Sequence, residues 1–280
     1  MVEKDRLLRL LRENKVAAFS AVLILIFVLA AVFAPFLAPY DPKQMDIMNR
    51  LSAPSAEHLL GTDEGGRDIL ARMLYGSRVS LLAGVLPTLM SMILGAALGL
   101  ISGFAGGIAD EIIMRIADVM LAFPSTLLAM LIMYTLGGGL MNVFLTLSLV
   151  SWAGIARVVR SETLRLRGSV YVTAARSIGV PKARIVLRHI LPNCVPTLIV
   201  LFTLSVPSAI LTESSLSFLG LGIQPPDTSW GLMINQGRQY LYNAPWCSFA
   251  PCIAIMLIVL AFNFLGDGLR DALDPHLQNQ

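Results

Sequence analysis

The chain has 280 residues, of which 56% are hydrophobic and only 14% are charged, and its formal net charge is +3. Soluble domains usually contain roughly 45–50% apolar and about 25% charged residues, so this composition indicates a membrane protein. The 22 glycines and 15 prolines follow no fixed period, and 3 cysteines cannot cross-link a chain of this length. These counts exclude a collagen, a disordered tail and a disulfide scaffold.

Five long runs of the chain contain no Asp, Glu, Lys or Arg. They cover residues 16–39, 79–109, 119–156, 189–212 and 239–266. A helix needs about 20 mostly apolar residues to cross a bilayer, and the third run is 38 residues long. Its glycines Gly137, Gly138 and Gly139 indicate a tight turn between two helices of about 17 residues each. No alternating ten-residue segments occur, so we expect an all-α polytopic membrane protein with six transmembrane helices.

These runs and the charged segments between them predict the elements in chain order. They are a basic N-terminal segment (1–15), a first span (16–39), an outer loop (40–78), a second span (79–103), a cytoplasmic loop (104–118), a third span (119–136), a fourth span (140–160), a cytoplasmic insertion (161–194), a fifth span (195–219), an outer loop (220–246), a sixth span (247–266) and a C-terminal segment (267–280). The first span follows basic residues, as a signal peptide would. However, Pro35 directly follows the only small-residue cleavage site, Ala34, so we expect a retained span.

The basic residues are distributed unequally over the two sides of the membrane. Six spans place both termini on one side, together with the loop around Arg115 and the segment from Arg157 to Arg188. These segments carry 15 Lys and Arg residues, and the loops on the other side carry 6. Because cytoplasmic loops are enriched in Lys and Arg, we expect both termini to be cytoplasmic. The five basic residues of the 40–78 loop run against this count, although long loops obey the rule less strictly.

The segment before the fifth span is basic and amphipathic, and Glu162 is its only acid. Residues 173–179 read as a short helix that ends at Gly179, and Val180 and Pro181 then turn the chain. A second helix is predicted from about Lys182. Two short helices at an angle would form a compact knob that can enter a groove on another protein.

The spacing in this segment resembles a known motif. Thr173, Ala174 and Ala175 are followed after three residues by Gly179 and after nine more by His189. This pattern resembles the EAA loop of ABC importer permeases, which docks on the ATP-binding subunits. Two residues depart from the motif, since Thr173 stands at its Glu position and His189 at its first hydrophobic position.

Three further stretches resemble the C-type permeases of the peptide/nickel importer subfamily. They are HLLGTDEGGRDILARMLYGSRVSL (58–81), SFLGLGIQPPDTSWGLMI (217–234) and NFLGDGLRDALDP (263–275). The resemblance covers nearly the whole chain and implies a type I ABC importer permease fold with a cytoplasmic coupling-helix loop. It implies a multi-pass protein of the bacterial or archaeal plasma (inner) membrane. The implied substrates are short peptides first, and nickel or a metal chelate second.

The resemblance also implies partners. They are a related second permease, two ABC ATPase subunits that bind ATP and Mg, and an extracytoplasmic substrate-binding protein. Membrane lipid is also an expected partner, and nucleic acid is not. The residues implied in coupling to the ATPases are Thr173, Ala174, Ala175, Gly179, Val180, Pro181 and Arg184. In the alternative interpretation, the arginines only enforce topology and bind anionic lipid headgroups.

Glu213 lies near the outer end of the fifth predicted span, beside Thr212, Ser214 and Ser215. An ionisable group at that depth indicates a functional role by default. Two interpretations are open. In the first, Glu213 faces the translocation path and meets the amino end of a peptide or a cation. In the second, it is tied to hydroxyls or to a neighbouring helix and serves only packing.

Small residues recur every fourth position along the second predicted span, at Gly95, Gly99 and Gly103. This spacing suits close helix contact. We expect packing within the chain more than contact with a partner permease. In the loop before this span, the acidic and glycine-rich stretch does not have EF-hand spacing, so we expect a turn there, with Asp68 near the start of a helix. This loop is expected to cover the outer mouth or to contact the partner.

Several catalytic motifs do not occur in the sequence. There is no Walker-type phosphate loop, no zinc-protease His-Glu motif and no Gly-x-Ser-x-Gly elbow. We therefore expect a non-catalytic subunit without a metal site or cofactor of its own. A proton- or sodium-coupled secondary transporter and an intramembrane enzyme are the alternatives. The first would need several intramembrane charges, of which only Glu213 is a candidate.

Overall fold

The computed structural model describes residues 14–273, and the regular structure in this range is helical. Among these residues the only β-pairing is an isolated bridge between Thr62 and Asp68. The predicted basic segment up to residue 13 and the C-terminal residues 274–280 lie outside the described residues.

Five helices are long and apolar enough to cross a membrane. They are α2 (Lys15–Val32), α4 (Ile69–Ala105), α7 (Leu140–Arg167), the continuous stretch Lys182–Phe218 that contains α10 (Leu191–Phe218), and α12 (Trp246–Leu273). Two further helices, α5 (Gly107–Ala122) and α6 (Ser125–Leu136), pass the same test together, although they are bent by 92°. The chain is therefore an all-α polytopic membrane protein with up to six spans.

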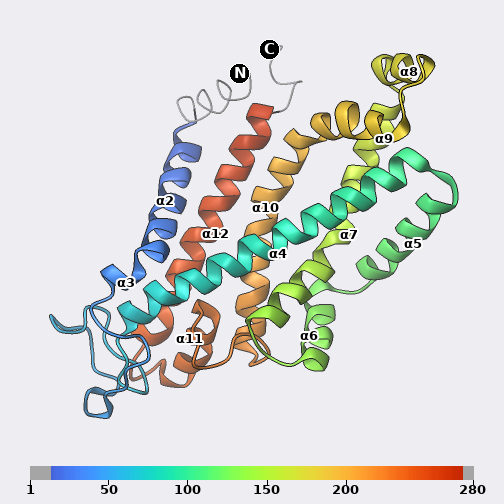
Figure 1. Cartoon of the computed structure of the whole chain (residues 1–280). Helices are drawn as coiled ribbons and strands as arrows, with labels where there is room; N and C mark the ends of the chain where they lie inside the picture. Colours follow the sequence, from blue (N-terminus) through green and yellow to red (C-terminus); the bar gives the residue numbers. More distant parts are fainter. Residues whose placement is uncertain (1–13, 274–280) are drawn as a thin grey trace.

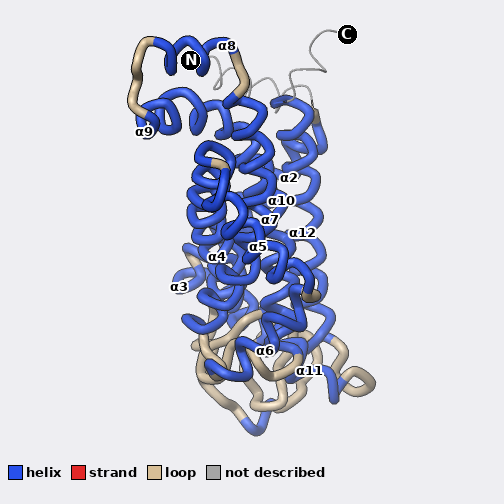
Figure 2. The backbone as a smooth tube through the Cα atoms, turned by 90° about the vertical axis from the view of Figure 1, so that its right-hand side faces the viewer, coloured by secondary structure: helices blue, strands red, loops and turns tan. Residues whose placement is uncertain are grey.

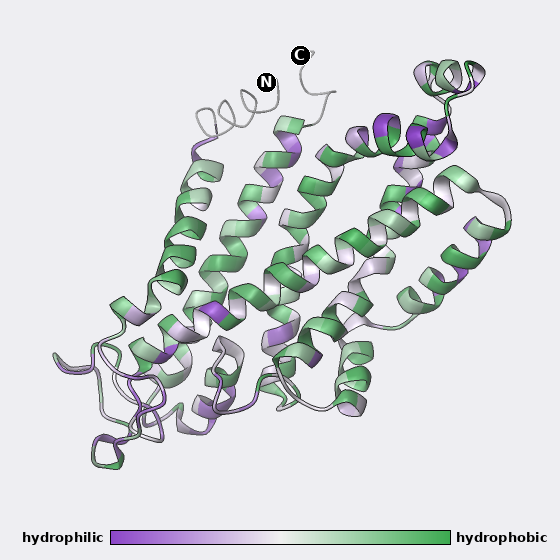
Figure 3. Ribbon diagram, viewed as in Figure 1, coloured by the Kyte–Doolittle hydropathy of each residue, from purple (hydrophilic) through white to green (hydrophobic). Residues whose placement is uncertain are grey.

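The long helices form a bundle with two distinct ends (Figure 1). At one end lie the start of α2, the end of α12 and the helix α8 (Val170–Ser177), and we call it the α8 end. At the other end, the α11 end, lie the short helices α3 (Ala34–Leu37) and α11 (Trp230–Gly237), as the rotated view also shows (Figure 2). The 3-10 turns Ile47–Asn49 and Arg238–Tyr240 belong to the segments that precede α4 and α12. Most hydrophilic residues gather in the loops of the α11 end and around α8, whereas the helices between them are mainly hydrophobic (Figure 3).

The third predicted span differs from the structure. Residues 104–118 were expected to be a loop, but α5 already begins at Gly107. Its charged residues interrupt the apolar run in the sequence, yet they lie on a helix that also exposes Ile108, Ile112 and Ile116. The helix ends at Phe123 because the following Pro124 disfavours a helical conformation in the residue before it, and Phe123 is extended.

The second predicted span is also longer in the structure. Helix α4 begins at Ile69, ten residues before the expected start at residue 79. Asp68 caps it, because its carboxylate accepts a hydrogen bond from the backbone N–H of Ala71 at 2.7 Å and contacts Nδ1 of His58 at 2.9 Å. At about 1.5 Å per residue, its 37 residues exceed the thickness of a bilayer core, so α4 tilts or extends beyond it.

The glycines of α4 lie against α7. A Cβ atom at Gly95, Gly99 or Gly103 would lie 2.5–2.9 Å from a backbone carbonyl oxygen of α7. No side chain fits in such a gap, so these positions let the two backbones approach closely. The contact lies within this chain and makes α4 and α7 a tightly packed pair.

Arg78 compensates for a proline in α3, directly after α2. Pro35 lacks an N–H, so the carbonyl of Ala31 has no helical donor four residues later. The guanidinium of Arg78 donates to that carbonyl and, at 2.8 Å, to the carbonyl of Val32. This arginine of α4 therefore fixes the end of α2 and the turn into α3.

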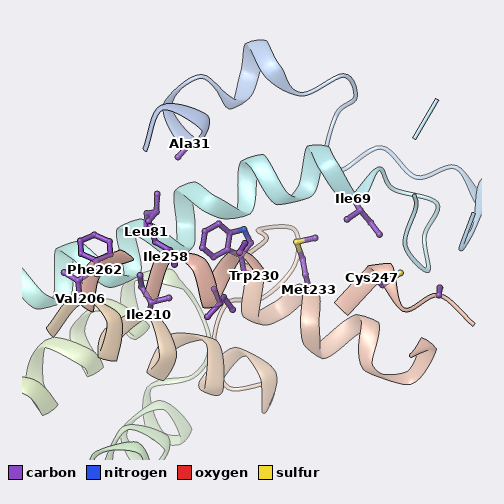
Figure 4. Packing of buried hydrophobic residues seen from close by; sticks show 13 residues of the cluster. Ala31, Ile69, Leu81, Val206, Ile210, Trp230, Met233, Cys247, Ile258 and Phe262 are labelled. Atoms are coloured by element: carbon purple, nitrogen blue, oxygen red, sulfur yellow. The ribbon is translucent and has the colours of Figure 1, made fainter. Parts of the chain in front are cut away.

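The largest cluster of buried apolar residues lies at the α11 end. Figure 4 shows Trp230 and Met233 of α11 near Leu81 of α4 and Ile258 of α12. The indole of Trp230 is 1% exposed, and its Nε1 donates to the carbonyl of Met73 at 3.2 Å. Because an aromatic side chain contributes most when its polar atom is also paired, Trp230 anchors α11 on α4.

Candidate functional site

The segment that connects α7 to α10 folds into an elbow, here residues 170–190. It consists of α8, the short helix α9 (Lys182–Ile185) and a π-helical segment (Val186–Ile190) that continues into α10. Gly179 has φ +78°, the left-handed conformation that ends helices at low cost. The N–H of Val180 bonds to the carbonyl of Ala175, and the N–H of Gly179 to that of Arg176, each at 3.1 Å. This is the Schellman pattern, so the Gly179-Val180-Pro181 sequence dictates the turn.

The elbow is held by apolar packing that it shares with α4, α7 and α10. Val172 and Ala175 of α8 pack in one buried cluster with Ile185, Ile190 and Cys194. Val172, Ile185 and Ile190 have no exposed surface. A close-packed contact of this kind transmits displacement, because it has no slack to absorb it.

The outer face of α8 exposes apolar and small side chains. Val170 is 86% and Ile178 is 81% exposed, and Thr173 and Ala174 between them are also exposed. Ala175, one of the residues implied in coupling, lies in the internal cluster and is only 7% exposed. The available surface is therefore the face of Val170, Ala174 and Ile178.

The basic residues of this region divide into two groups. Three of the four arginines on α7 are paired within the chain: Arg157 lies 2.6 Å from Asp118, Arg160 lies 2.6 Å from Asp110, and Arg165 pairs with Glu162. Those of the elbow, including Arg184 and Arg188, have no carboxylate within 4.0 Å among residues 14–273. Arg184 and Arg188 are exposed. The elbow therefore presents unneutralised positive charge.

A hollow lies between α4, α6, α7 and α10, with a volume of about 250 Å³. Its lining carries no charged residue, but seven of its thirteen lining residues bear a hydroxyl group: Thr88, Ser91, Ser125, Ser151, Ser205, Ser208 and Thr212. We call these seven residues the hydroxyl groove.

The hydroxyls on α10 form a stripe. Ser205, Ser208, Thr212 and Ser215 are three or four residues apart and therefore lie on one side of the helix. The hydroxyl of Thr212 donates to the carbonyl of Ser208, and that of Ser215 to the carbonyl of Leu211, both at 2.7 Å. Because the proton is used within the helix, the oxygen lone pairs remain free to accept hydrogen bonds.

Glu213 lies next to this stripe but points into the chain. Its side chain has no exposed surface. One carboxylate oxygen accepts from the hydroxyls of Ser217 at 2.7 Å and Ser229 at 2.9 Å, and the other lies 3.4 Å from the hydroxyl of Ser214. Ser229 in turn caps α11, because its oxygen accepts from the N–H of Leu232. Glu213 therefore ties α10 to the start of α11.

A buried charge network holds the loops of the α11 end together. The guanidinium of Arg72 pairs with Asp63 and also donates to Gln236 at 2.7 Å and Thr228 at 3.2 Å. Asp63 also accepts from Nε of Arg67 at 2.8 Å. Residues of the loop between α3 and α4, of α4 and of the segment around α11 are thus joined in one network. The acidic, glycine-rich stretch forms a turn, and among the described residues no group of three His, Cys, Asp or Glu side chains is placed to hold a metal ion.

The hydroxyl groove and the Arg72 network were not foreseen from the sequence. A signal for the groove existed, since Ser205, Ser208 and Thr212 have helical spacing within an apolar run. No local signal identified the Arg72 network, because Asp63 and Gln236 are far apart in the sequence.

Comparisons with known proteins agree with this architecture. Residues 95–279 match the family model described as binding-protein-dependent transport system inner membrane component. Residues 5–54 match the N-terminal TM domain of oligopeptide transport permease C.

Several curated relatives are similar over nearly the whole chain. The oligopeptide transport system permease protein OppC of Bacillus subtilis is 42% identical over 98% of this chain and 90% of its own length. The glutathione transport system permease protein GsiD of Pectobacterium atrosepticum is 45% identical over 97% and 90%. The dipeptide transport system permease protein DppC of Alkalihalophilus pseudofirmus is 44% identical over 96% and 88%.

Solved structures support the fold. An inward-facing crystal form of the MetNI methionine ABC transporter has a chain that aligns with a TM-score of 0.58 and 18% identity, over 71% of this chain and 94% of that one. At this identity the match concerns the fold alone. The family model and the relatives carry the assignment, and they confirm the predicted relationship: the chain belongs to the family of binding-protein-dependent transport system inner membrane components and is a transmembrane permease of the ABC importer type.

Proposed function

We propose that this chain is the permease subunit that translocates short peptides in an ATP-driven importer. The observation that carries the proposal is the full-length similarity to permeases named for oligopeptide, glutathione and dipeptide transport. Glutathione is itself a tripeptide, so all three names describe small molecules with amide groups. The names do not favour nickel or a metal chelate as the substrate.

The chain works with partners in this proposal. Two ATPase subunits supply the energy and bind ATP and Mg, a related second permease completes the path, and an extracytoplasmic binding protein delivers the peptide. This chain has no phosphate-binding loop in its sequence and takes the non-catalytic role. The α8 end faces the cytoplasm in this proposal, which the excess of basic residues at this end supports. The chain then spans the inner membrane several times, with both termini cytoplasmic.

The elbow is the coupling element. Its outer face of Val170, Ala174 and Ile178 is a small apolar ridge that suits a groove on an ATPase subunit. The elbow continues without interruption into α10, since the helical stretch runs from Lys182 to Phe218. A displacement of α8 therefore reaches α10 through the packed cluster around Ile185 and Ile190, and not through a flexible loop.

The hydroxyl groove is the part of the translocation path that this chain supplies. Its oxygens accept hydrogen bonds, and peptides bring donors in their amide N–H groups and their ammonium group. No charged residue lines the groove, so it does not select strongly between peptides of different side-chain charge. Movement of α10 changes the position of Ser205, Ser208 and Thr212 and thus couples the elbow to the path.

The secondary-transporter alternative has little support in the described residues. It relied on Glu213 as an intramembrane charge on the path. That carboxyl is enclosed by hydroxyls of α10 and by Ser229, which favours the interpretation of Glu213 as a packing residue.

Substitution of Ile178 by Glu tests the coupling role. The side chain is 81% exposed, so the variant folds, but a charge enters the apolar ridge. We expect co-purification of the ATPases with the transporter to fall at least about ten-fold and ATP-dependent uptake to be lost, while the conservative variant Ile178→Val retains both. Full ATPase binding and uptake by Ile178→Glu would refute the elbow as the docking element.

The substrate class is tested with the cognate binding protein. Its melting temperature is measured with di- and tripeptides, glutathione, Ni²⁺ and a nickel chelate, since a ligand that binds only the folded state raises it. We expect a rise with peptides. A rise with nickel alone would replace the peptide proposal. ATP-independent uptake by liposomes that contain only this chain would overturn the importer mechanism itself.

A further inference from the structure

Another hollow lies behind the elbow, on the side turned toward α4. It has a volume of about 670 Å³ and separates the last turns of α4 from α9 and the end of α7. We call it the elbow groove. It is distinct from the outer ridge of α8, because Val170, Ala174 and Ile178 do not line it.

The floor of the elbow groove is apolar and continues the surface of a membrane-spanning helix. Leu100, Ile101 and Phe104 come from the end of α4, and Leu187 comes from the opposite wall. Ile101 is 51% and Leu187 is 61% exposed. Apolar side chains at the end of a span are exposed at the depth where acyl chains meet lipid headgroups, so this floor suits hydrocarbon better than water.

The rim of the elbow groove is cationic. Arg167, Arg176 and Lys182 line it, and none of the three has a carboxylate within 4.0 Å in the described part of the chain. The guanidinium of Arg176 lies over the ring of Phe104, 5.6 Å from its centroid. Arg167 makes only a long hydrogen bond of 3.5 Å to the carbonyl of Gly103. The other three arginines of α7, Arg157, Arg160 and Arg165, are paired with Asp or Glu, so the unpaired charge of this rim is not a general property of the region.

We propose that the elbow groove binds an anionic phospholipid, with its phosphate among Arg167, Arg176 and Lys182 and its acyl chains along Ile101 and Leu187. An unpaired cationic rim above an apolar floor is complementary to a charged headgroup on a hydrocarbon tail. A protein partner fits this groove less well, since an acidic peptide would leave the apolar floor against polar backbone. The lipid would bridge the end of α4 and the elbow, and would stiffen the contact through which the elbow moves α10.

The assembled transporter with all its subunits is the material for the test. It is purified in detergent, incubated with equal amounts of phosphatidylglycerol and phosphatidylcholine, and the retained lipid is counted by native mass spectrometry. We expect phosphatidylglycerol to be retained selectively. Replacement of any one groove cation by Gln should lower the retention of phosphatidylglycerol about five-fold, because one Lys or Arg near an anionic membrane surface contributes about that much to binding.

Three controls make the result specific to the groove. The exchange of Arg188, which is also cationic and exposed but lies outside the groove, to Gln should leave retention unchanged. The exchange of Arg167 and Arg176 to Lys should restore most of it, because the charge remains. Excess inorganic phosphate should not displace the lipid, because phosphate lacks the hydrocarbon that binds the floor.

Several outcomes would overturn the proposal. Equal retention of both lipids would do so, as would equal losses in the groove and the control variants. Displacement by inorganic phosphate would assign the rim to a free anion. Normal retention together with loss of the ATPases from the groove variants would assign the rim to a protein partner. The test does not depend on the substrate, so its failure would leave the peptide-importer proposal standing.

Discussion

The contact between α4 and α7 leads to a quantitative prediction for Gly99. A Cβ atom there would lie 2.5 Å from the carbonyl oxygen of Ala156 and 2.8 Å from Cβ of Val159. Both neighbours belong to the backbone or lie directly on it, so they move only if the helices separate. Gly154 on α7 is a matched control, because a Cβ atom there meets nothing within 4 Å.

The two Gly→Ala substitutions should change the free energy of unfolding in opposite directions. Alanine is favoured over glycine in a helix by about 1 kcal/mol, so Gly154→Ala should be neutral or stabilising by up to about that amount. Gly99→Ala gains the same term but carries an overpacking cost of roughly 1–3 kcal/mol. The free energies of unfolding should therefore differ by about 1–3 kcal/mol. At about 2 °C for each kcal/mol, the melting temperature of Gly99→Ala should lie about 2–6 °C below that of Gly154→Ala.

Thermal unfolding of the assembled transporter, followed by differential scanning fluorimetry, measures this difference. Equal melting temperatures of the two variants would refute the argument from close backbone contact. Another result would assign Gly95, Gly99 and Gly103 to the interface between the two permeases. In that result, Gly99→Ala releases the second permease from the transporter, but the Gly99→Ala chain purified alone unfolds at the same temperature as Gly154→Ala.

Three further predictions concern the charged residues. Glu213→Ala removes the acceptor of two buried serine hydroxyls and should lower the free energy of unfolding by about 1–3 kcal/mol. Glu213→Gln keeps an acceptor oxygen and should leave peptide uptake within about two-fold of the unmodified transporter. Loss of uptake by a normally assembled Gln variant would place the residue on the translocation path. Arg72→Met leaves Asp63 buried without its partner and should destabilise the chain by about 3–5 kcal/mol, which scanning fluorimetry would detect. An unchanged melting temperature would contradict a stabilising role of the Arg72 network. A double-mutant cycle of Asp110→Asn and Arg160→Gln should give a coupling energy of about 0.5–3 kcal/mol, since this partly buried pair joins α5 to α7; a coupling of zero would show that it does not.

Much of the architecture followed from the sequence because its causes are local. A run of about 20 apolar residues favours a membrane span whatever its neighbours do. The elbow was predictable for the same reason, since Gly179 supplies the left-handed turn and Pro181 prevents the helix from continuing. The family resemblance rests on such local stretches and was confirmed by the relatives.

The same local argument misplaced one element. The charges of α5 interrupt the apolar run, so residues 104–118 were interpreted as a loop. In the structure, Asp110 is neutralised by Arg160 from α7, fifty residues later, and accepts from the hydroxyl of Ser102. The partner that makes the charge tolerable lies on another helix and is not visible in the local pattern.

The surroundings of individual side chains were decided by tertiary packing. The sequence placed Glu213 near the end of a span, but only the fold brings Ser229 to its carboxylate and closes the site. Likewise, the spacing of Gly95, Gly99 and Gly103 indicates close contact without naming the partner, and the structure assigns it to α7. A span depends on hydrophobicity that one segment carries alone, whereas a site depends on which distant segments meet, and that is settled only when the helices pack.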